Sequence, residues 1–389
     1  MDKYFICICI FINGIFCSEY AIHKPQHSAH EQFSLKFLSK SYKENMNLLI
    51  FPYAIETQLK AIGLGSYKIT QYEFRNCLKN PLQVDELNEF HTETIFNLQT
   101  ALNQGFYTQK HALYLGSKIT VDPNFLTKTQ KLCPMDIIYE DQNKSITTKI
   151  HDWVLQRFKK NLSKFPEINI KEAKGKIFPI TYIDFSFYWK TPFDQQNTSV
   201  DSFQYPIGIK THGIVDVMHQ INNVDYFEDD ALQAVELPLE NHLSCVILLP
   251  KQDDNSKILS LVSKSNYFKK IISKMKKTNV DIRLPKIQLE SPFYYKETLL
   301  KLGLAQPFSK LADFKYLDQN HALILDTPIQ IGKISFQESG INTDYGLKKT
   351  KSVALTPEAS ININHSFLFF IIDSRNLTLY CSGCYQNPF

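Results

Sequence analysis

The chain has 389 residues, of which 43% are hydrophobic and 21% are charged, the composition of an ordinary globular protein. The formal net charge is only +4 and no long basic block accompanies it, which argues against nucleic acid or a membrane as a partner. The densest group of lysines, in residues 269–277, is interpreted as a solvated helix face, with a polyanion-binding patch as the alternative.

The first 18 residues have the pattern of a signal peptide. Lys3 precedes an apolar run over residues 4–16, and the small residues Cys17 and Ser18 follow it. This run is too short to cross a bilayer, and no later segment is long and apolar enough to do so. A buried N-terminal strand or helix is the alternative. We therefore predict that residues 1–18 are a signal peptide and that the protein is secreted and extracellular.

Five N-x-S/T sequons agree with a secretory route. Glycans are attached to such sequons only along that route. Short motifs of this kind also arise by chance, so the prediction depends on all five together. The predicted glycosylation sites are Asn143, Asn161, Asn197, Asn364 and Asn376.

The cysteines and histidines do not indicate a metal or redox centre. Five cysteines follow residue 18, an odd number at irregular spacing, which is not typical of a disulfide scaffold. Cys381 and Cys384 lie in a strand-like block, where they would face opposite sides of a sheet, with a redox or zinc site as the alternative. A metal site at His23, His27 and His30 would need a helix, and a mobile N-terminus is favoured. We predict no metal and no cofactor.

No catalytic motif stands out. The chain has no G-x-S-x-G elbow, no P-loop and no H-E-x-x-H. The segment Gly63-Leu64-Gly65 lacks the rest of a dinucleotide fingerprint and is expected to end a helix. No Ser/His/Asp or Cys/His set can be selected among eleven scattered histidines. We therefore predict that the protein is not an enzyme.

Helices are predicted mainly in the first part of the chain. Apolar side chains that repeat every three or four positions indicate helices over residues 29–43, 53–67, 84–103 and 145–160. A later helix is predicted over residues 293–302. It is expected to end at Gly303, because glycine favours the backbone conformation of a helix C-terminus.

Strand patterns dominate the second half of the chain. Residues 180–189 alternate between apolar and more polar side chains, which predicts a long strand with one buried face. The buried side chains of this strand would be Ile183, Phe185, Phe187 and Trp189. Residues 243–249 are almost continuously apolar, as in a strand that is covered on both sides.

Two further strand regions are predicted near the C-terminus. The alternation in residues 280–289 changes phase at Pro285, which predicts a bulge at that proline. Residues 367–372 and 377–380 are apolar, and the turn residues 373–376 between them predict a hairpin.

The order of these elements predicts an α+β fold with one long connection. Helices come first and strands follow, instead of alternating, and no linker or repeat divides residues 19–389, so they are predicted to form a single domain. The polar residues 341–360 lie between a strand-like block at 329–336 and a buried strand that starts near Ile363. Long loops in a compact domain are usually functional or disordered, so we predict an exposed working loop at 341–360.

Several blocks in one order resemble the serpin family. They are residues 182–194 (YIDFSFYWKTPFD), 215–220 (VDVMHQ), 234–239 (AVELPL), 280–287 (VDIRLPKI), 296–304 (KETLLKLGL) and 364–370 (NHSFLFF). Their order and spacing make the resemblance specific, and it covers about residues 30–389. It implies a serpin-like fold, with N-terminal helices packed around a large central mixed β-sheet, smaller sheets and an exposed reactive-centre loop.

The resemblance implies that the loop is bait for a serine protease. The serine of the protease attacks the loop and forms an acyl-enzyme, and the cut loop then inserts into the central sheet and distorts the protease. Strain stored in the native fold drives this step. Serine proteases are therefore the implied partners, through a covalent complex, and the protein is expected to be a monomer. The hinge of the loop would include Glu338, Gly340, Ile341, Thr343 and Tyr345.

The hinge sequence has the alternation of an inserting strand but not its usual sizes. Ile341, Thr343 and Tyr345 would face the core after insertion, and none of them is charged. Inhibitory serpins resemble one another in having small residues here, whereas Ile341 and Tyr345 are bulky. Overpacking costs about 1–3 kcal/mol per site, so we expect slower insertion.

The sheet-opening region of the family usually holds a small polar network beneath the central strands. The matching positions are Phe51, Ala54, Thr181 and Gln330, with Trp189 at the end of the same strand as Thr181. Most of the polar side chains of that network are missing at these positions. This predicts either an apolar repacking of the region or impaired opening of the sheet.

The reactive bond is predicted near the C-terminal end of the loop. Counting forward from the hinge by the usual spacing of the family reaches Ala354, and counting back from the following strand reaches Leu355. The candidates are therefore Ala354, Leu355 and Thr356, and an apolar residue here suits a protease of chymotrypsin or elastase type. Lys351 is the alternative and would suit a trypsin-like protease.

Two functions remain as hypotheses from the sequence. The first is a secreted inhibitor of serine endopeptidases that acts as a suicide pseudo-substrate. The second is a non-inhibitory serpin-fold binding or carrier protein, whose loop is cleaved without trapping the protease. The bulky hinge residues Ile341 and Tyr345 and the altered sheet-opening positions motivate this second hypothesis.

Overall fold

The computed structural model describes residues 25–388 except 80–81, 83–106, 142, 159–166, 169–172, 206–211, 253, 265, 291, 321 and 343–354. The predicted signal peptide and the predicted helix at 84–103 therefore lie entirely outside the described residues. The described helices are α1 (Pro25–Ser41), α2 (Pro52–Leu64), α3 (Lys68–Leu78), α5 (Pro123–Thr129), α6 (Ile146–Phe158), α7 (Asn255–Val262), α8 (Tyr267–Lys274) and α9 (Lys296–Lys301), with the 3-10 turns η1 (Gln195–Asn197) and η2 (Gln306–Phe308).

Three of the helices predicted in the first 160 residues are confirmed as α1, α2 and α6, with shifted ends. Helix α2 begins at Pro52, a residue type suited to the first turn because its missing N–H has no partner there in any case. The later predicted helix is confirmed as α9, although it starts at Lys296. Gly303 follows it with a φ of 88°, the left-handed conformation expected at a helix C-terminus.

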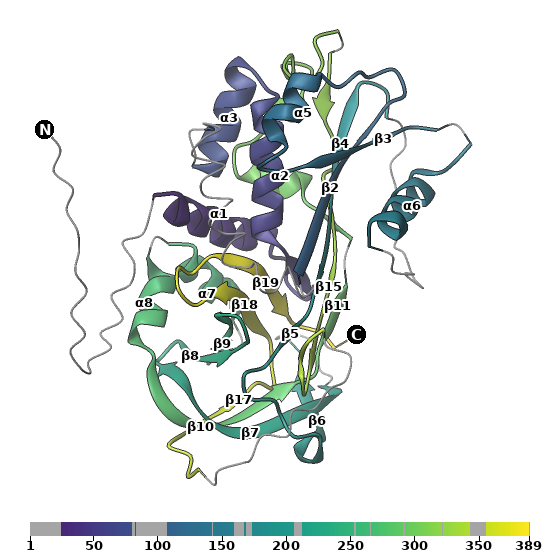
Figure 1. Cartoon of the computed structure of the whole chain (residues 1–389). Helices are drawn as coiled ribbons and strands as arrows, with labels where there is room; N and C mark the ends of the chain where they lie inside the picture. The colour runs from purple at the N-terminus through teal and green to yellow at the C-terminus, as the bar shows by residue number, and fades with distance from the viewer. Residues whose placement is uncertain are drawn as a thin grey trace, which may run out of the picture.

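The central sheet has the strand order β12-β14-β4-β2-β3, and β13 also pairs with β4. Helices α2 and α6 lie on opposite sides of β2 and β4 (Figure 1), and each covers its own cluster of buried apolar side chains. Strands β4 and β14 run parallel to each other. The strands are β2 (Tyr107–Leu115), β3 (Met135–Tyr139), β4 (Lys176–Phe185), β12 (Phe293–Tyr294), β13 (Ile324–Leu325) and β14 (Ile329–Ile331).

A second group of strands continues β4 and β14 in the chain direction. Its order is β11-β15-β16-β5, with β5 (Phe187–Tyr188), β11 (Gln288–Glu290), β15 (Lys333–Gln337) and β16 (Gly340–Ile341). Only Ser186 separates β4 from β5, and only Gly332 separates β14 from β15. We call the direct pairing of β4 with β14 the closed half of the sheet. We call the part in which β16 lies between β5 and β15 the open half.

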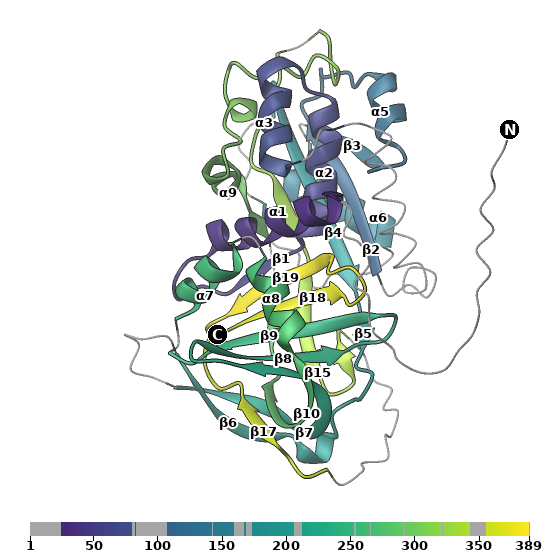
Figure 2. The same ribbon diagram turned by 90° about the vertical axis from the view of Figure 1, so that its left-hand side faces the viewer.

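The remaining strands form one large curved sheet, seen in the lower part of Figure 2. Its order is β1-β19-β18-β9-β8-β7-β10-β17, and β6 pairs with β7. The strands are β1 (Leu48–Ile50), β6 (Ser199–Gln204), β7 (His212–Glu228), β8 (Leu232–Pro238), β9 (Leu243–Pro250), β10 (Lys276–Pro285), β17 (Ala359–Asn362), β18 (Phe367–Asp373) and β19 (Leu379–Tyr385).

The predicted strands are confirmed except for the bulge at Pro285, but the single buried face predicted for residues 180–189 is wrong in β4, where residues 177–183 are buried on both faces. The strand predicted at 180–189 is β4 followed by β5, and its predicted buried residues are all at most 3% exposed. Every residue of β9 is buried, and β18 and β19 form the predicted hairpin. The predicted bulge at Pro285 is wrong, because β10 ends there and β11 begins at Gln288 in another sheet. The change of phase therefore marks a passage of the chain from one sheet to the next.

The C-x-x-C cysteines face opposite sides of β19, as predicted from the alternation of a strand. Cys381 packs in the cluster that contains Phe369, and Cys384 packs in the cluster that contains Leu368. Both are free and buried. Burial raises the pKa of the Cys381 thiol well above its usual range, which disfavours the reactive thiolate.

A buried ionic cluster holds α2 in place beneath the sheet. Glu56 of α2 contacts His30 of α1, and Lys60 Nζ lies 2.6 Å from Glu56 Oε1. His30 Nε2 accepts a hydrogen bond of 3.1 Å from the backbone N–H of Leu379 in β19. Burial raises the pKa of Glu56, but the charges and hydrogen bonds of Lys60 and His30 outweigh it and lower this pKa to about 2. The expectation of a mobile N-terminus is therefore wrong at His30.

Candidate functional site

The hinge begins at Glu338, which is fixed from two sides. Thr198 Oγ1 donates to Glu338 Oε1 at 2.9 Å, and Lys286 Nζ lies 3.1 Å from Glu338 Oε2. The backbone N–H of Phe193 donates to the Glu338 carbonyl at 2.9 Å. Burial raises the pKa of the Glu338 carboxyl, but hydrogen bonds from its own backbone, Thr198 and Lys286 outweigh it and leave the pKa below its ordinary value. The carboxylate is thus held in its charged form.

Gly340 and Ile341 already form a strand inside the sheet. Strand β16 is antiparallel to both neighbours, with Ile341 opposite Phe336 of β15 and opposite Phe187 of β5. Ile341 is 0% exposed. A Cβ atom at Gly340 would lie 2.1 Å from the Phe187 carbonyl oxygen, so only glycine fits this close approach. The prediction that the exposed loop begins at Ile341 is therefore wrong.

Trp189 supports the hinge end of the sheet. Its indole Nε1 donates to the Gln337 carbonyl at 2.8 Å, and its backbone N–H donates to the Ser339 carbonyl at 3.1 Å. Its ring lies 6.0 Å from that of Phe336 and 6.1 Å from that of Phe193, in edge-on contacts. Trp189 therefore lies at the open half and not at the closed half, where the other predicted sheet-opening residues lie.

The other predicted sheet-opening residues meet beneath the closed half. Thr181 of β4 and Gln330 of β14 are opposite each other in the ladder, and both are 0% exposed. Gln330 Oε1 accepts from the backbone N–H of Phe51 at 2.7 Å, and Gln330 Nε2 donates to the Leu49 carbonyl at 3.2 Å. Ala54 is also 0% exposed and lies on α2. The closed half is therefore tied to the segment that leads into α2.

A polar network is present here, although Phe51 and Ala54 contribute no polar side chain, and residues outside the predicted positions complete it. Thr181 Oγ1 donates to Gln58 Oε1 at 2.9 Å and lies 3.1 Å from His111 Nδ1. Gln58 Nε2 also donates to the carbonyls of Ala112 at 3.2 Å and Ile180 at 3.0 Å. The sheet-opening residues predicted from the family resemblance did not include Gln58 or His111. Gln58 lies one helical turn after Ala54, a signal that was available, whereas the pairing of His111 with Thr181 depends on strand register.

The C-terminal end of the loop is anchored to the large curved sheet. Strand β17 runs parallel to β10, and just before it the backbone N–H of Glu358 donates to the Asn279 carbonyl at 2.8 Å. Residues 359–360, predicted as loop, therefore belong to a strand. Leu355 is partly exposed and Thr356 is exposed. The hinge residues Thr343 and Tyr345 and the candidate bond residues Lys351 and Ala354 lie outside the described residues.

The predicted glycosylation sites differ in exposure. Asn143 and Asn197 are exposed, while Asn364 and Asn376 are partly buried. Asn161 lies outside the described residues. Glycosylation at all five positions stays a prediction.

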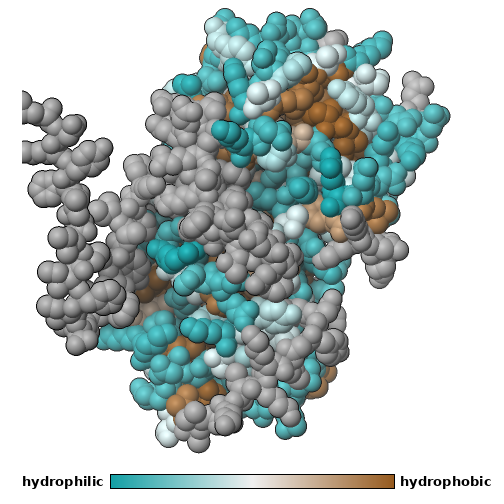
Figure 3. Space-filling view, in the orientation of Figure 1, coloured by the Kyte–Doolittle hydropathy of each residue, from teal (hydrophilic) through white to brown (hydrophobic). Residues whose placement is uncertain are grey.

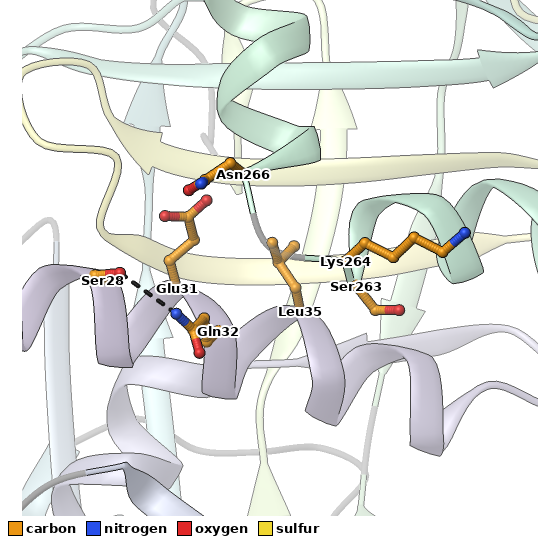
Figure 4. A pocket seen from close by; sticks show the side chains of 7 residues that line it. All are labelled: Ser28, Glu31, Gln32, Leu35, Ser263, Lys264 and Asn266. Carbon is orange, nitrogen blue, oxygen red and sulfur yellow. Dashed lines mark hydrogen bonds between the residues drawn. The ribbon is translucent and has the colours of Figure 1, made fainter.

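A hollow between α1 and the α7–α8 connection is too small for an organic ligand. Its volume is about 10 Å³, which is space for a single water. Figure 4 shows Glu31 and Leu35 of α1 directed toward Asn266 and Ser263, and Gln32 donating to Ser28 at 3.5 Å. The described surface in Figure 3 is mostly hydrophilic, with an apolar area beside α5 and further apolar areas near α6 and at the lower end of the molecule.

Within the described residues, no group of three or more metal-binding side chains is placed to hold an ion. The side chains of His23 and His27 lie outside the described part. Among the helices that are described, none has the length and apolar character needed to cross a membrane.

The short strand β16 lies between β5 and β15, and β17, after the predicted loop, pairs in the large curved sheet. This arrangement matches the architecture implied by the sequence blocks. The family described as serpin (serine protease inhibitor) matches residues 28–388. The chain therefore belongs to the serpin family.

Relatives of known name are distant but cover most of the chain. Neuroserpin of Gallus gallus is 23% identical, over 90% of this chain and 88% of its own. Leukocyte elastase inhibitor A of Rattus norvegicus is 24% identical, over 88% of this chain and 94% of its own. An uncharacterised serpin-like protein of Thermococcus kodakarensis is 23% identical, over 94% of this chain and 86% of its own.

Solved structures show the same fold. The thermophilic serpin tengpin in its native state superposes with a TM-score of 0.81 at 20% identity, covering 93% of this chain and 94% of its own. Human thyroxine-binding globulin superposes with a TM-score of 0.79 at 21% identity, covering 93% of this chain and 98% of its own. The predicted α+β serpin fold, with helices around a large mixed sheet and smaller sheets, is thereby confirmed.

Proposed function

We propose that the protein is a secreted inhibitor of serine endopeptidases that acts as a suicide pseudo-substrate. The single observation that carries this proposal is β16. The hinge residues Gly340 and Ile341 are paired with strands on both sides, in the orientation that insertion of the following residues would require. Membership of a family described as serine protease inhibitors supports the same conclusion.

The burial of Ile341 removes one objection to insertion. Its side chain is bulky for a hinge position, yet it is fully buried between Phe187 and Phe336 in a contiguous core cluster. Further insertion has to separate β4 from β14, in which residues 180–182 pair with residues 329–331. An inserted strand would pair with β4 on one side and with β14 on the other, in place of the direct pairing of β4 with β14. The number of backbone hydrogen bonds would therefore rise.

The bait is proposed to be the bond between Leu355 and Thr356 or the one between Ala354 and Leu355. The protease serine Oγ would attack the carbonyl carbon of the first residue and form an ester, while its proton passes to the leaving backbone nitrogen. Thr356 is exposed, and Ala359 begins the anchoring strand β17. An apolar side chain at Leu355 suits a protease of chymotrypsin or elastase type, and Lys351 would suit trypsin.

Incubation with chymotrypsin, elastase and trypsin tests this proposal. We expect an SDS-stable complex of the combined mass with chymotrypsin or elastase, and mass spectrometry of the released peptide identifies the bond. In the variant Leu355→Arg the complex should form with trypsin instead. The matched control Thr343→Arg keeps the bait but would place a charge against the core on insertion, so it should be cleaved without forming the complex. Cleavage of the unmodified chain without any complex would contradict the proposal.

The second candidate function is a non-inhibitory binding or carrier protein. It is motivated by the structural similarity to thyroxine-binding globulin, which was solved in complex with thyroxine. The hollow between α1 and α7–α8 offers only about 10 Å³, far less than a ligand of drug size needs. Melting of the loop-cleaved product separates the two functions. A large rise in melting temperature indicates insertion, and an unchanged value favours the carrier function.

Secretion and glycosylation are part of the proposal. Expression in a eukaryotic secretory host should yield a monomeric protein in the medium, with its N-terminus close to Glu19. Enzymatic removal of N-linked glycans should increase its gel mobility, and substitution of the exposed Asn143 and Asn197 should remove part of that shift. Retention inside the cell with an intact N-terminus would contradict this part of the proposal.

A further inference from the structure

The loop leaves the sheet at Asn342, but the side chain of this residue stays in it. Its backbone has a φ of 52°, so the chain turns out of the β16 direction immediately after Ile341. The backbone N–H of Asn342 still donates to the Ser335 carbonyl at 2.9 Å. Asparagine tolerates this left-handed conformation better than most residues with side chains. Asn342 therefore occupies the point at which the open half meets the closed half.

The side-chain amide of Asn342 bonds to both strands, β4 and β15, that border the boundary between the open and closed halves. Its Nδ2 donates to the Phe185 carbonyl of β4 at 2.9 Å and to the Lys333 carbonyl of β15 at 3.0 Å. Its Oδ1 accepts from the backbone N–H of Ser335 at 2.7 Å and from Ser335 Oγ at 3.2 Å. One side chain thus satisfies three backbone groups on two strands.

The register of β16 explains why these three groups need partners. If the strand continued in register, residue 342 would lie opposite Ser335, residue 343 opposite Phe185 and residue 344 opposite Lys333. In an antiparallel ladder, the N–H groups of residues 343 and 344 would then bond to the carbonyls of Phe185 and Lys333. The carbonyl of residue 342 would accept from the N–H of Ser335. The amide of Asn342 fills all three positions in place of the next backbone groups.

Because the amide of Asn342 takes the place of these backbone groups, it stabilises the state in which only Gly340 and Ile341 are inserted in the sheet. Partly buried strand groups that lack partners are costly, and Asn342 supplies the partners of two of them, the Phe185 carbonyl and the Ser335 N–H. Insertion of the next residue must turn Asn342 out of its left-handed conformation and break the bonds of its amide before the backbone bonds form. The amide therefore opposes both withdrawal of β16 and its further growth.

We propose that Asn342 is a latch that holds the uncleaved loop at the two-residue stage and sets the barrier to insertion of the residues that follow. The latch regulates the trapping reaction, and in that role it rests on the proposed function. As a property of the uncleaved protein it can be tested without any protease.

Hydrogen exchange and spontaneous insertion test the latch in the full chain. Asn342→Gly keeps the left-handed conformation available and deletes the amide. Asn342→Asp keeps a side chain and the acceptor for Ser335, but loses both donors to the Phe185 and Lys333 carbonyls. The matched control is Asn241→Gly, at a turn residue with a φ of 61° between β8 and β9.

In both Asn342 variants, amide exchange in residues 333–337 should become faster by about tenfold or more, since two or more hydrogen bonds are lost. Exchange in residues 329–331 should be unchanged. On prolonged warming, the uncleaved variants should also convert to a form of higher melting temperature about tenfold faster than the unmodified chain. Asn241→Gly should change neither quantity.

Two results would overturn the latch. One is an Asn342→Gly variant that exchanges and converts like the Asn241→Gly control, which would make Asn342 an ordinary turn residue. The other is slower conversion, which would mean that the amide assists insertion. The outcome for the proposed function is separate. A latch effect without any SDS-stable protease complex would contradict only the inhibitor function, and a trapped protease with unchanged exchange would contradict only the latch.

Discussion

The closed and open halves of the central sheet are built from the same two chain segments but are held by different contacts. In the closed half, Thr181 and Gln330 are opposite each other on directly paired strands. In the open half, Phe187 and Phe336 are the corresponding partners of Ile341, which lies between them. The difference shows that these strands accept either direct pairing or an intervening strand.

Side-chain amides mark both states of the sheet. Gln330 ties the closed half to the segment before α2 through the N–H of Phe51 and the carbonyl of Leu49. Asn342 bonds to β4 and β15 at the boundary between the halves, where the two chain segments separate to admit β16. The boundary between the halves is therefore fixed by polar groups. The apolar side chains also differ: Ile180 and Ile329 of the closed half pack in one core cluster, and Phe187, Phe336 and Ile341 of the open half pack in another. Changes to these contacts should affect one half more than the other.

The largest effect is expected in the closed half, for Gln330→Leu. The change leaves the N–H of Phe51 and the carbonyl of Leu49 buried without their partner, and each such group costs about 1–3 kcal/mol. We expect the free energy of unfolding to fall by about 2–6 kcal/mol in denaturant titrations. The control Gln288→Leu, on an exposed strand position, should change it by no more than about 0.5 kcal/mol. Equal losses in the two variants would contradict the importance of this contact.

A smaller effect is expected in the open half, for Gly340→Ala. The added methyl group would meet the Phe187 carbonyl, so β16 must shift or leave the sheet, at a cost of about 1–3 kcal/mol. The fluorescence of Trp189, whose indole bonds to Gln337, should change in a Trp153→Phe background. As a control, Gly303→Asn adds a side chain where no atom lies within 4 Å and where asparagine tolerates the φ. No difference between the two variants would show that β16 is not tightly seated.

The smallest effect is expected from the titration of Glu338 at the hinge. Hydrogen bonds outweigh burial and lower the pKa of this carboxyl below its ordinary value of 4.5. Its contribution to stability is therefore fully present above about pH 4.5 and is lost as the pH falls through the lower pKa of the folded state. Unfolding titrations of the unmodified chain and of Glu338→Gln should differ at pH 7 and converge in acid. A constant difference down to pH 3 would contradict this assignment.

The sequence predicted those parts of the fold that local patterns encode. Period-2 alternation in residues 180–189 identified the strand and the buried side chains Ile183, Phe185 and Phe187, and helical periodicity identified α2. Both signals come from neighbouring residues, because a strand or a helix buries one face whatever its partner is. The family resemblance located Glu338 and Gly340 at the start of the loop in the same way, from residues that follow one another in the chain.

Tertiary structure alone decided how distant segments meet. The passage of the chain between sheets after Pro285, the network of Gln58 with His111, and the seating of Ile341 beside Phe187 all depend on strand register. Register joins residues far apart in sequence, and no local period records it. The composition and order of residues 338–342 thus determined that a hinge exists here, while the pairing of β5 with β15 through β16 decided how far it enters the sheet.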